Sequence, residues 1–292
     1  MRLPDNIIEC VAFICVQRTD KGIARYESIG TAFFMSIDSK TVSNAKYSYL
    51  VTAKHLVQGG EQLYLRMNTK GGAYELIRLE EQWMFSQDQS VDLAVMPFAP
   101  DSRIFEYKTG DCTMLATESK LTEHSIGIGE EIAIPGLFVA RTGNKRNIPI
   151  VRFGNIAAMP SEKLIDKKGQ EYHAYLVEVR SIGGLSGSPV FAYLGPSRVN
   201  PPKGNIDLGH WYIFLVGVVR GHWSQLKPKH KINVLADDAE NVNMGIAVVT
   251  PATELEAIIY GDYLTKGRAR KDQELILESA AAIKEDSSIL SN

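Results

Sequence analysis

The segment Ile182-Gly183-Gly184-Leu185-Ser186-Gly187-Ser188-Pro189-Val190 places one serine inside a glycine-rich turn that leads into an apolar strand. Gly183, Gly184 and Gly187 permit backbone angles that other residues rarely adopt. This freedom lets backbone N–H groups converge on one point, as an oxyanion formed by attack of a hydroxyl on a carbonyl requires. The turn therefore predicts Ser186 as a nucleophile, with the N–H groups of Gly184 and Ser186 as its oxyanion hole.

Two earlier segments supply the groups that a serine nucleophile needs. Leu50-Val51-Thr52-Ala53-Lys54-His55 ends an apolar strand on a histidine, and Ser90-Val91-Asp92-Leu93-Ala94-Val95 opens another with an aspartate. A histidine can accept the hydroxyl proton, and a carboxylate can hold the imidazole in the required tautomer. Each segment alone fits an ordinary surface or turn residue. Together they predict a catalytic triad of His55, Asp92 and Ser186.

Most of the remaining chain has the pattern of short strands. Twelve runs rich in Val, Ile, Tyr and Phe are separated by Gly, Asn, Asp and Ser, with six runs before Asp101 and six after Gly129. Such a pattern favours an all-β fold built of barrels or a sandwich. At the N-terminal end, residues 7–16 are expected as a buried strand, because a glutamate interrupts the apolar centre that a signal peptide would need.

Helical signal is confined to the C-terminal end. Thr250 is expected to cap a helix with Pro251 at its first position. A second helix is expected at 272–283, after a basic and polar linker at 266–271. These elements would follow the last strand of the β-structure.

The composition excludes several classes of function. The chain has 292 residues, of which 45% are hydrophobic and 23% charged, as in ordinary globular proteins. Its 32 basic and 34 acidic residues give a formal net charge of -2, whereas binding to nucleic acids or anionic membranes usually requires a basic excess. No apolar run approaches the ~20 residues that span a bilayer. We therefore expect neither a nucleic-acid nor a membrane partner.

The cysteines and the other candidate motifs indicate no metal and no organic cofactor. Cys10, Cys15 and Cys112 are too few for a disulfide framework and lack metal-ligand spacing, so we expect buried thiols and a cytoplasmic protein. Gly127-Ile128-Gly129 lacks the third glycine of a dinucleotide site. Pro189-Val190-Phe191 opens a strand where the serine elbow of an α/β-hydrolase needs a helix.

The order His55, Asp92, Ser186 carries a family resemblance. With Thr-Ala-x-His, Asp-Leu-Ala-Val and Gly-x-Ser-Gly-x-Pro around these residues, the chain resembles the trypsin-like serine peptidases of the chymotrypsin fold. It is similar in particular to the bacterial Deg-type peptidase domains, over roughly Ile7 to Tyr263. The resemblance implies two six-stranded antiparallel barrels with the triad in the cleft between them. It divides the chain into an N-terminal barrel at 1–110, a C-terminal barrel with a closing helix at 111–263, and a helical or flexible tail at 264–292.

Three positions depart from the pattern of that family. Ser188 stands where a glycine is common, and Leu185 stands where zymogen-type animal enzymes carry an aspartate that receives the new N-terminus. Activation by that route is therefore not expected. Lys54 replaces a small residue beside His55, and we expect its side chain to point to solvent.

The resemblance implies a serine endopeptidase that hydrolyses protein or peptide substrates through an acyl-enzyme, without a cofactor. Ser186 would attack the carbonyl, His55 would move the proton, and Asp92 would hold the imidazole. The alternative is a peptide-binding module on the same fold. Such a module would be either non-catalytic or a latent peptidase whose oxyanion loop a partner orders.

Substrate contacts are expected along the strand that follows the serine motif. In the family this strand offers an edge to the substrate backbone, so Val219, Arg220 and Gly221 are expected to pair with it. Ser181, Arg220 and His222 are expected to line the primary specificity pocket, and their polar or cationic groups favour acidic or polar side chains before the cut. The alternative is that Arg220 and His222 face solvent at the end of the strand.

The C-terminal tail is shorter than the peptide-binding PDZ-like module that accompanies Deg-type peptidases. Its apolar residues predict a stripe for a regulatory partner or a second copy of the chain: Leu275, Ile276, Leu277, Ala280 and Ile283. The alternative is that this helix packs on its own barrel or frays.

Overall fold

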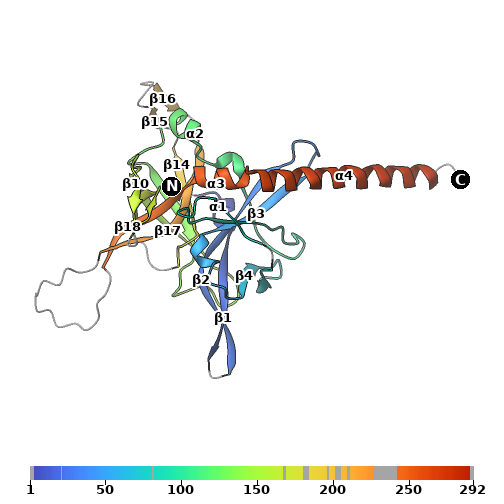
Figure 1. The fold of residues 1–292 in the computed structure, drawn as a ribbon, viewed down its shortest axis with the longest axis horizontal. Coiled ribbons are helices and arrows are strands. Elements are labelled where there is room, and N and C mark those ends of the chain that lie inside the picture. Colours follow the sequence, from blue (N-terminus) through green and yellow to red (C-terminus); the bar gives the residue numbers. More distant parts are fainter. Residues whose placement is uncertain are drawn as a thin grey trace, which may run out of the picture.

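Two β-structures, one open and one closed, form the body of the protein (Figure 1). The computed structural model describes residues 3–20, 22–80, 82–166, 169–179, 184–195, 197–200, 205–208, 211–225 and 242–289. The first half of the chain forms the open sheet and the second half forms the closed barrel. The helix at the C-terminal end extends away from both (Figure 1).

The N-terminal sheet has eight strands in the order β5-β4-β1-β2-β3-β7-β6, with β8 paired in parallel to β2. Their bounds are β1 (Val11–Asp20), β2 (Ile23–Asp38), β3 (Lys46–Thr52), β4 (Leu63–Asn68), β5 (Tyr74–Arg78), β6 (Met84–Phe85), β7 (Ala94–Pro97) and β8 (Gly110–Asp111). Side chains alternate between the two faces of a strand. On β2, Phe33 and Met35 therefore pack in one apolar cluster, whereas Ala32 and Phe34 pack in another.

The C-terminal barrel closes in the order β10-β13-β18-β17-β14-β9. Its strands are β9 (Glu131–Gly136), β10 (Ile150–Ala158), β13 (Tyr175–Val179), β14 (Pro189–Leu194), β17 (Tyr212–Gln225) and β18 (Val242–Pro251). Two hairpins extend from it, β11 (Leu164–Ile165) with β12 (Glu171–Tyr172), and β15 (Ser197–Asn200) with β16 (Asn205–Leu208). Ile132, Val177 and Val249 are among the fully buried residues that fill this barrel.

One apolar cluster joins the two β-structures. It contains Leu93 of the N-terminal sheet, Phe191 of β14 and Leu255 of α3 (Ala252–Ile259), all fully buried. Burial of a large apolar side chain contributes roughly 1.5–3 kcal/mol. The sheet and the barrel therefore share a continuous core.

The expected fold is confirmed in part. The chain is mostly β, and its second half forms a closed six-stranded barrel. The first half has eight strands rather than six, and no pair of strands closes it among the described residues. Gly110 and Asp111, at the expected boundary between the halves, pair with β2 of the N-terminal sheet.

The first element of the chain is a helix and not the expected strand from residue 7. α1 (Asp5–Glu9) precedes β1, which begins at Val11. Pro4 at the N-cap cannot donate a backbone hydrogen bond, and Asp5 places a negative charge at the positive end of the helix. Ile7 is buried in the shared core. Short helices α2 (Glu118–Glu123), η1 (Lys54–Leu56) and η2 (Cys112–Met114) complete this part of the fold.

The C-terminal helices differ from the expected ones in two ways. α3 begins at Ala252 after Pro251, and Thr250 is a buried strand residue paired with Val218 rather than a cap. The expected linker at 266–271 lies inside the single helix α4 (Asp262–Ile289). Its basic residues are good helix formers, and exposed ion pairs at helical spacing support them: Lys266 with Asp262 and Lys271 with Glu274.

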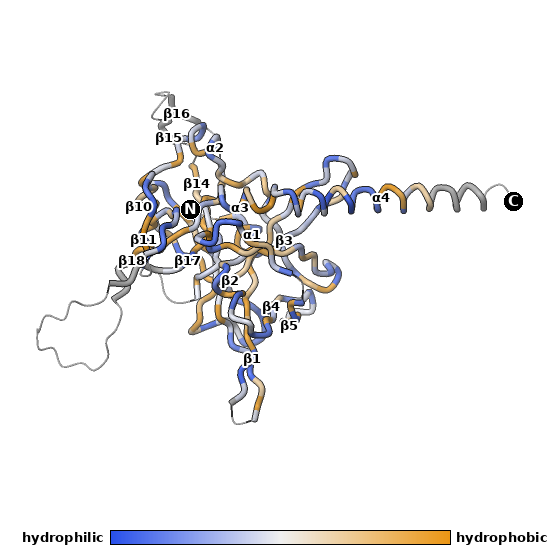
Figure 2. The backbone as a smooth tube through the Cα atoms, viewed as in Figure 1, coloured by the Kyte–Doolittle hydropathy of each residue, from blue (hydrophilic) through white to orange (hydrophobic). Residues whose placement is uncertain are grey.

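Asp272 fastens α4 to the loop between β2 and β3. Its carboxylate accepts hydrogen bonds from Ser39 Oγ at 2.8 Å, from Thr41 Oγ1 at 2.5 Å and from the Tyr47 hydroxyl. Beyond this point α4 leaves the body, and Figure 2 shows mixed polar and apolar residues along it. Ile276 and Leu277 are exposed there. No helix in the described part of the chain combines the length and apolarity that crossing a membrane requires.

Candidate active site

His55 and Asp92 meet at one end of the N-terminal sheet. β3 and β7 are antiparallel neighbours with Thr52 opposite Ala94. His55, shortly after β3, and Asp92, shortly before β7, therefore lie at the same end of this strand pair. His55 Nδ1 lies 2.7 Å from Asp92 Oδ2, and the main-chain N–H of His55 donates to Asp92 Oδ1 at 2.9 Å. The carboxylate therefore holds both the ring and the backbone of the histidine.

The carboxylate of Asp92 is buried, whereas the imidazole of His55 is partly exposed. The side chain of Asp92 is 8% exposed, whereas that of His55 is 46% exposed. Burial raises the pKa of Asp92, but the hydrogen bonds and charge of His55, together with the charge of Arg220, outweigh it and leave the pKa below its ordinary value. Asp92 is thus an anion at neutral pH.

Ser186 comes from the C-terminal barrel, in the turn that leads into β14. Thr31 of β2 holds this turn from the opposite side: its N–H donates to the Ser186 carbonyl at 2.9 Å, and its hydroxyl donates to the Gly184 carbonyl at 3.1 Å. The same hydroxyl accepts the N–H of Leu137 at 2.8 Å. Among the described residues, no main-chain acceptor takes the N–H of Gly184 or Ser186.

Two glycines of the turn are required by backbone conformation and by close approach. Gly187 has φ +82°, and a Cβ atom there would lie 2.0 Å from the Thr31 carbonyl oxygen. Gly184 has φ +100°, and its Cβ atom would lie 2.6 Å from a methyl carbon of Val139. Any L-residue would be strained at both positions. Gly183 lies outside the described residues.

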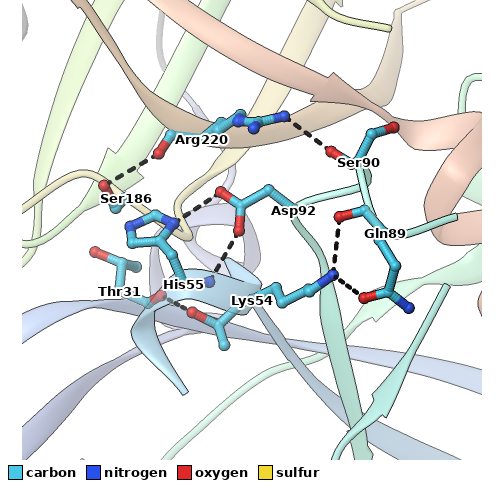
Figure 3. A network of polar contacts seen from close by, with 9 residues as sticks. Thr31, Lys54, His55, Gln89, Ser90, Asp92, Ser186 and Arg220 are labelled. Carbon is cyan, nitrogen blue, oxygen red and sulfur yellow. Dashed lines mark hydrogen bonds and ion pairs between the residues drawn. The ribbon is translucent and has the colours of Figure 1, made fainter. Parts of the chain in front are cut away.

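In Figure 3 the hydroxyl of Ser186 is directed to the main-chain carbonyl of Arg220 and is not bonded to the imidazole of His55. Ser186 Oγ donates to the carbonyl oxygen of Arg220 at 3.4 Å. No hydrogen bond joins it to the ring of His55, although both residues belong to the described part of the chain. Rotation about the Cα–Cβ bond of Ser186 is the movement that redirects the hydroxyl.

Arg220 of β17 lies with the segment that carries Asp92. Its guanidinium donates to the Ser90 carbonyl at 2.9 Å and stands 4.0 Å above the centre of the Tyr172 ring. The guanidinium thus has partners within the protein, and its predicted role in a specificity pocket stays a prediction. The prediction of a preference for acidic substrates depends on this guanidinium, which binds Ser90 and Tyr172 of the protein itself.

The remaining predicted contact residues are placed differently from one another. Val219 is fully buried; its N–H donates to the Ser188 carbonyl at 2.9 Å, and its carbonyl accepts the N–H of Gly187 at 2.8 Å. Because both groups are occupied, Val219 is not available to pair with a substrate, and that prediction is wrong. Gly221 is partly exposed with open space around it. Ser181 and the side chain of His222 lie outside the described residues.

Lys54 is buried, and the prediction that it points to solvent is wrong. Only 7% of the residue is exposed, and its Nζ donates to the carbonyl and the side-chain oxygen of Gln89 at 3.0 and 3.2 Å. Its position beside His55 gave no signal of this, because the acceptors belong to a loop distant in the chain. Thr31 is a further residue of the site that the sequence analysis did not identify.

The two other departures from the family pattern are accommodated by packing. Leu185 is buried in the core of the C-terminal barrel. Ser188 is fully buried beside Gly136, where a Cβ atom would lie 2.0 Å from Ser188 Oγ. The glycine at 136 therefore provides the space that the serine occupies.

Within the described residues, no group of three or more His, Cys, Asp or Glu side chains converges as a metal site. All three cysteines are unpaired and buried. Burial raises the pKa of Cys10 and of Cys112 to about 12, so both are protonated at neutral pH.

No protein-family model and no curated protein sequence matches the chain. Its neighbours among solved structures are HtrA/Deg-type trypsin-like serine proteases. The HtrA-type protease AlgW with a decapeptide is 16% identical, with a TM-score of 0.49, over 88% of this chain and 66% of that chain. The Rv3671c protease from M. tuberculosis in its active form is 16% identical, with a TM-score of 0.45, over 87% of this chain and 80% of that chain. The MamO protease domain from Magnetospirillum magneticum is 12% identical, with a TM-score of 0.46, over 86% of this chain and 96% of that chain.

Proposed function

We propose that the protein is a serine endopeptidase that acts through His55, Asp92 and Ser186. One observation carries the proposal. A buried carboxylate binds both Nδ1 and the main-chain N–H of the exposed His55 (Figure 3), and the turn that carries Ser186 packs against the strand end that leads to this histidine, since a Cβ atom at Gly187 would lie 2.4 Å from Thr52 Oγ1. This is the arrangement in which an imidazole serves as the general base for a serine hydroxyl.

The proposed reaction begins when the Ser186 hydroxyl turns to the imidazole. Its oxygen attacks the peptide carbonyl while the proton passes to His55 Nε2, and Asp92 stabilises the resulting imidazolium. The negative charge on the carbonyl oxygen is accepted by the N–H groups of Gly184 and Ser186. His55 then protonates the leaving amine. An ester on Ser186 remains, which water hydrolyses with His55 again taking and returning the proton.

The bond between Ser186 and the Arg220 carbonyl supports a second candidate. A peptidase whose hydroxyl rests on a carbonyl oxygen is inactive until the side chain turns. Docking of a substrate or a regulatory partner can supply that change, since a ligand shifts an equilibrium toward the state it binds better. The second candidate is thus a latent peptidase, or a peptide-binding module of the same fold.

The proposed substrate is an extended segment of a protein or peptide. It would pair with the strand edge at Gly221, where the structure leaves open space, and not with Val219. The proposed location is the cytoplasm, supported by three unpaired cysteines. Exposed Ile276 and Leu277 on α4 support binding of a regulatory partner or a second copy, which light scattering of a chain lacking residues 276–292 tests.

Labelling with a fluorophosphonate probe tests the peptidase proposal. We expect the folded protein to be labelled, Ser186→Ala to lose all labelling, and His55→Ala to label at least ~10³-fold more slowly. Ser188→Ala is the matched control, because its buried hydroxyl has no hydrogen-bond partner among the described residues. Labelling that requires an added peptide identifies the latent form. Folded protein that no condition labels contradicts the enzyme and leaves the binding module.

A further inference from the structure

Arg220 lies at a bulge in the pairing of β17 with β18. Val219 is opposite Val249 and Gly221 is opposite Val248, so the register shifts at the residue between them. A bulge redirects a side chain out of the alternation of its strand. Here it sends the Arg220 side chain past Asp92 toward Ser90, while the carbonyl of the same residue accepts the hydroxyl of Ser186 (Figure 3).

The contacts of the guanidinium fix it without a direct ion pair. It donates to the Ser90 carbonyl at 2.9 Å and stacks on Tyr172 of β12, a residue that is only 6% exposed. A planar guanidinium makes such a bond and stacks on a ring at the same time, which a lysine ammonium does not. Within the described residues, no carboxylate lies within ion-pair distance of it. Its charge therefore acts on the nearby Asp92.

A second cation holds the same segment from the opposite side. Lys54 of η1 donates to the carbonyl and the side chain of Gln89, one residue before the Ser90 that Arg220 binds. The segment leading into Asp92 is thus fastened by one cation from the N-terminal sheet and one from the C-terminal barrel. Asp88 adds an internal bond by accepting the N–H of Ser90 at 2.8 Å.

We propose that Arg220 is a positioning residue that fastens the Asp92 segment to the C-terminal barrel and so holds the carboxylate in place beside His55. The role in turnover rests on the proposed peptidase function, whereas the role in holding the carboxylate does not. Two groups face Asp92 from other elements, the imidazole of His55 from η1 and the guanidinium of Arg220 from β17, and both favour its anionic form. On its own loop, Asp88 is the other titratable group, with Lys163 and His173 in its surroundings.

Titration of Asp92 by NMR tests the proposal without reference to activity. The proton on His55 Nδ1 is observed at low field, assigned by its loss in His55→Gln, and followed to acid pH until Asp92 is protonated. We expect Arg220→Gln to raise the midpoint by about one pH unit, because it removes an opposite charge near a partly buried carboxylate. Arg220→Lys should bring the titration midpoint of Asp92 back to near its wild-type value, since it returns the positive charge but not the planar guanidinium group.

Arg268 provides the matched control. Like Arg220, it donates to a main-chain carbonyl, that of Ile259 at 2.9 Å, and lies over a tyrosine ring, that of Tyr49, but it belongs to α4. Arg268→Gln should leave the midpoint unchanged. If Arg220→Gln does not fold, Tyr172→Leu removes the stacking partner while keeping the charge. For Tyr172→Leu we expect the titration midpoint of Asp92 to rise, but by less than in Arg220→Gln.

The same variants separate this proposal from the peptidase proposal. With an active wild type, fluorophosphonate labelling of Arg220→Gln at pH 7 should be about tenfold slower, with a fall in kcat and an unchanged KM for peptide cleavage. A shifted midpoint in a protein that is never labelled supports the role of Arg220 and contradicts the peptidase. An unchanged midpoint in Arg220→Gln, or in Tyr172→Leu if that is the variant measured, overturns the role of Arg220.

Discussion

The N–H of Thr31 donates to the carbonyl of Ser186 at 2.9 Å, across the cleft between the sheet and the barrel. The Thr31 hydroxyl occupies the Gly184 carbonyl in the same way, at 3.1 Å. Thr31 therefore fastens the turn that carries Ser186 to β2, although it belongs to the opposite half of the chain. Among the described residues, no main-chain acceptor takes the N–H of Gly184 or of Ser186.

Replacing the Thr31 hydroxyl should weaken the turn without changing its volume. Thr31→Val leaves the buried N–H of Leu137 and the carbonyl of Gly184 without their partner, which we expect to cost about 1–3 kcal/mol in the free energy of unfolding. Fluorophosphonate labelling should slow by ~10². Thr31→Ser keeps the hydroxyl and should retain the free energy of unfolding and the labelling rate of the wild type. Equal labelling by Thr31→Val and wild type would contradict this role.

Gly187→Ala should be among the most destabilising single changes in the chain. Position 187 has φ +82°, and the new methyl group would lie 2.0 Å from the Thr31 carbonyl oxygen. The left-handed conformation alone costs roughly 1–2 kcal/mol, and the clash adds to it. Gly195→Ala is the control, because that position has open space and no positive φ. Urea unfolding measures both, and similar midpoints would show that the turn relaxes.

Asp92 makes stability depend on acid pH. Its folded-state pKa lies below the ordinary value of 3.8, so its ionised form stabilises the fold above that value. This contribution is lost as the pH falls through the depressed pKa. Between pH 7 and pH 3, the free energy of unfolding of Asp92→Asn should therefore fall less than that of wild type. Parallel losses in urea titrations at the two pH values would contradict the assignment.

Lys54→Met should cost more stability than an equivalent change at an exposed lysine. It removes a buried ammonium and leaves the Gln89 carbonyl without its donor, at an expected cost of about 1–3 kcal/mol. Lys46→Met breaks an ion pair whose two side chains are 47% and 67% exposed, for which we expect less than about 1 kcal/mol. Thermal unfolding of both variants checks the contrast, and a larger loss for Lys46→Met would refute it.

Asp272→Asn should release α4 from the loop between β2 and β3. The neutral amide accepts less strongly from Ser39, Thr41 and Tyr47. Hydrogen exchange in residues 265–275 should become faster by about tenfold, while exchange in the barrel stays unchanged. Glu274→Gln, which breaks only the exposed pair with Lys271, should have little effect. Unchanged exchange in Asp272→Asn would show that other contacts hold the helix.

The residue types of the candidate site can be predicted from the sequence, whereas the directions of the side chains around them cannot. His55 and Asp92 are predicted because their residue types, together with Ser186 and the motifs around all three, match the requirements of a catalytic triad. The contacts of Lys54 and Arg220 are not predicted, since their acceptors on Gln89 and Ser90 are revealed only by tertiary structure. Arg220 also depends on a bulge, which strand patterns do not encode.

Errors in the secondary structure have similar causes. The segment 266–271 was interpreted as a linker because of its polarity, yet ion pairs and good helix formers continue the helix through it. Thr250 has the residue type of a cap, but its pairing with Val218 extends the strand. The N-terminal half was assigned six strands on the resemblance, and the short β6 and β8 raise the number to eight.

Leu93, next to Asp92, and Phe191, five residues after Ser186, belong to the same buried cluster. The segments that carry Asp92 and Ser186 are consequently packed against one interior. Moving one of them as a rigid body would expose apolar surface of the other, which opposes such a movement. Truncating either interior residue would disturb the acid and the nucleophile together, even though neither touches a ligand.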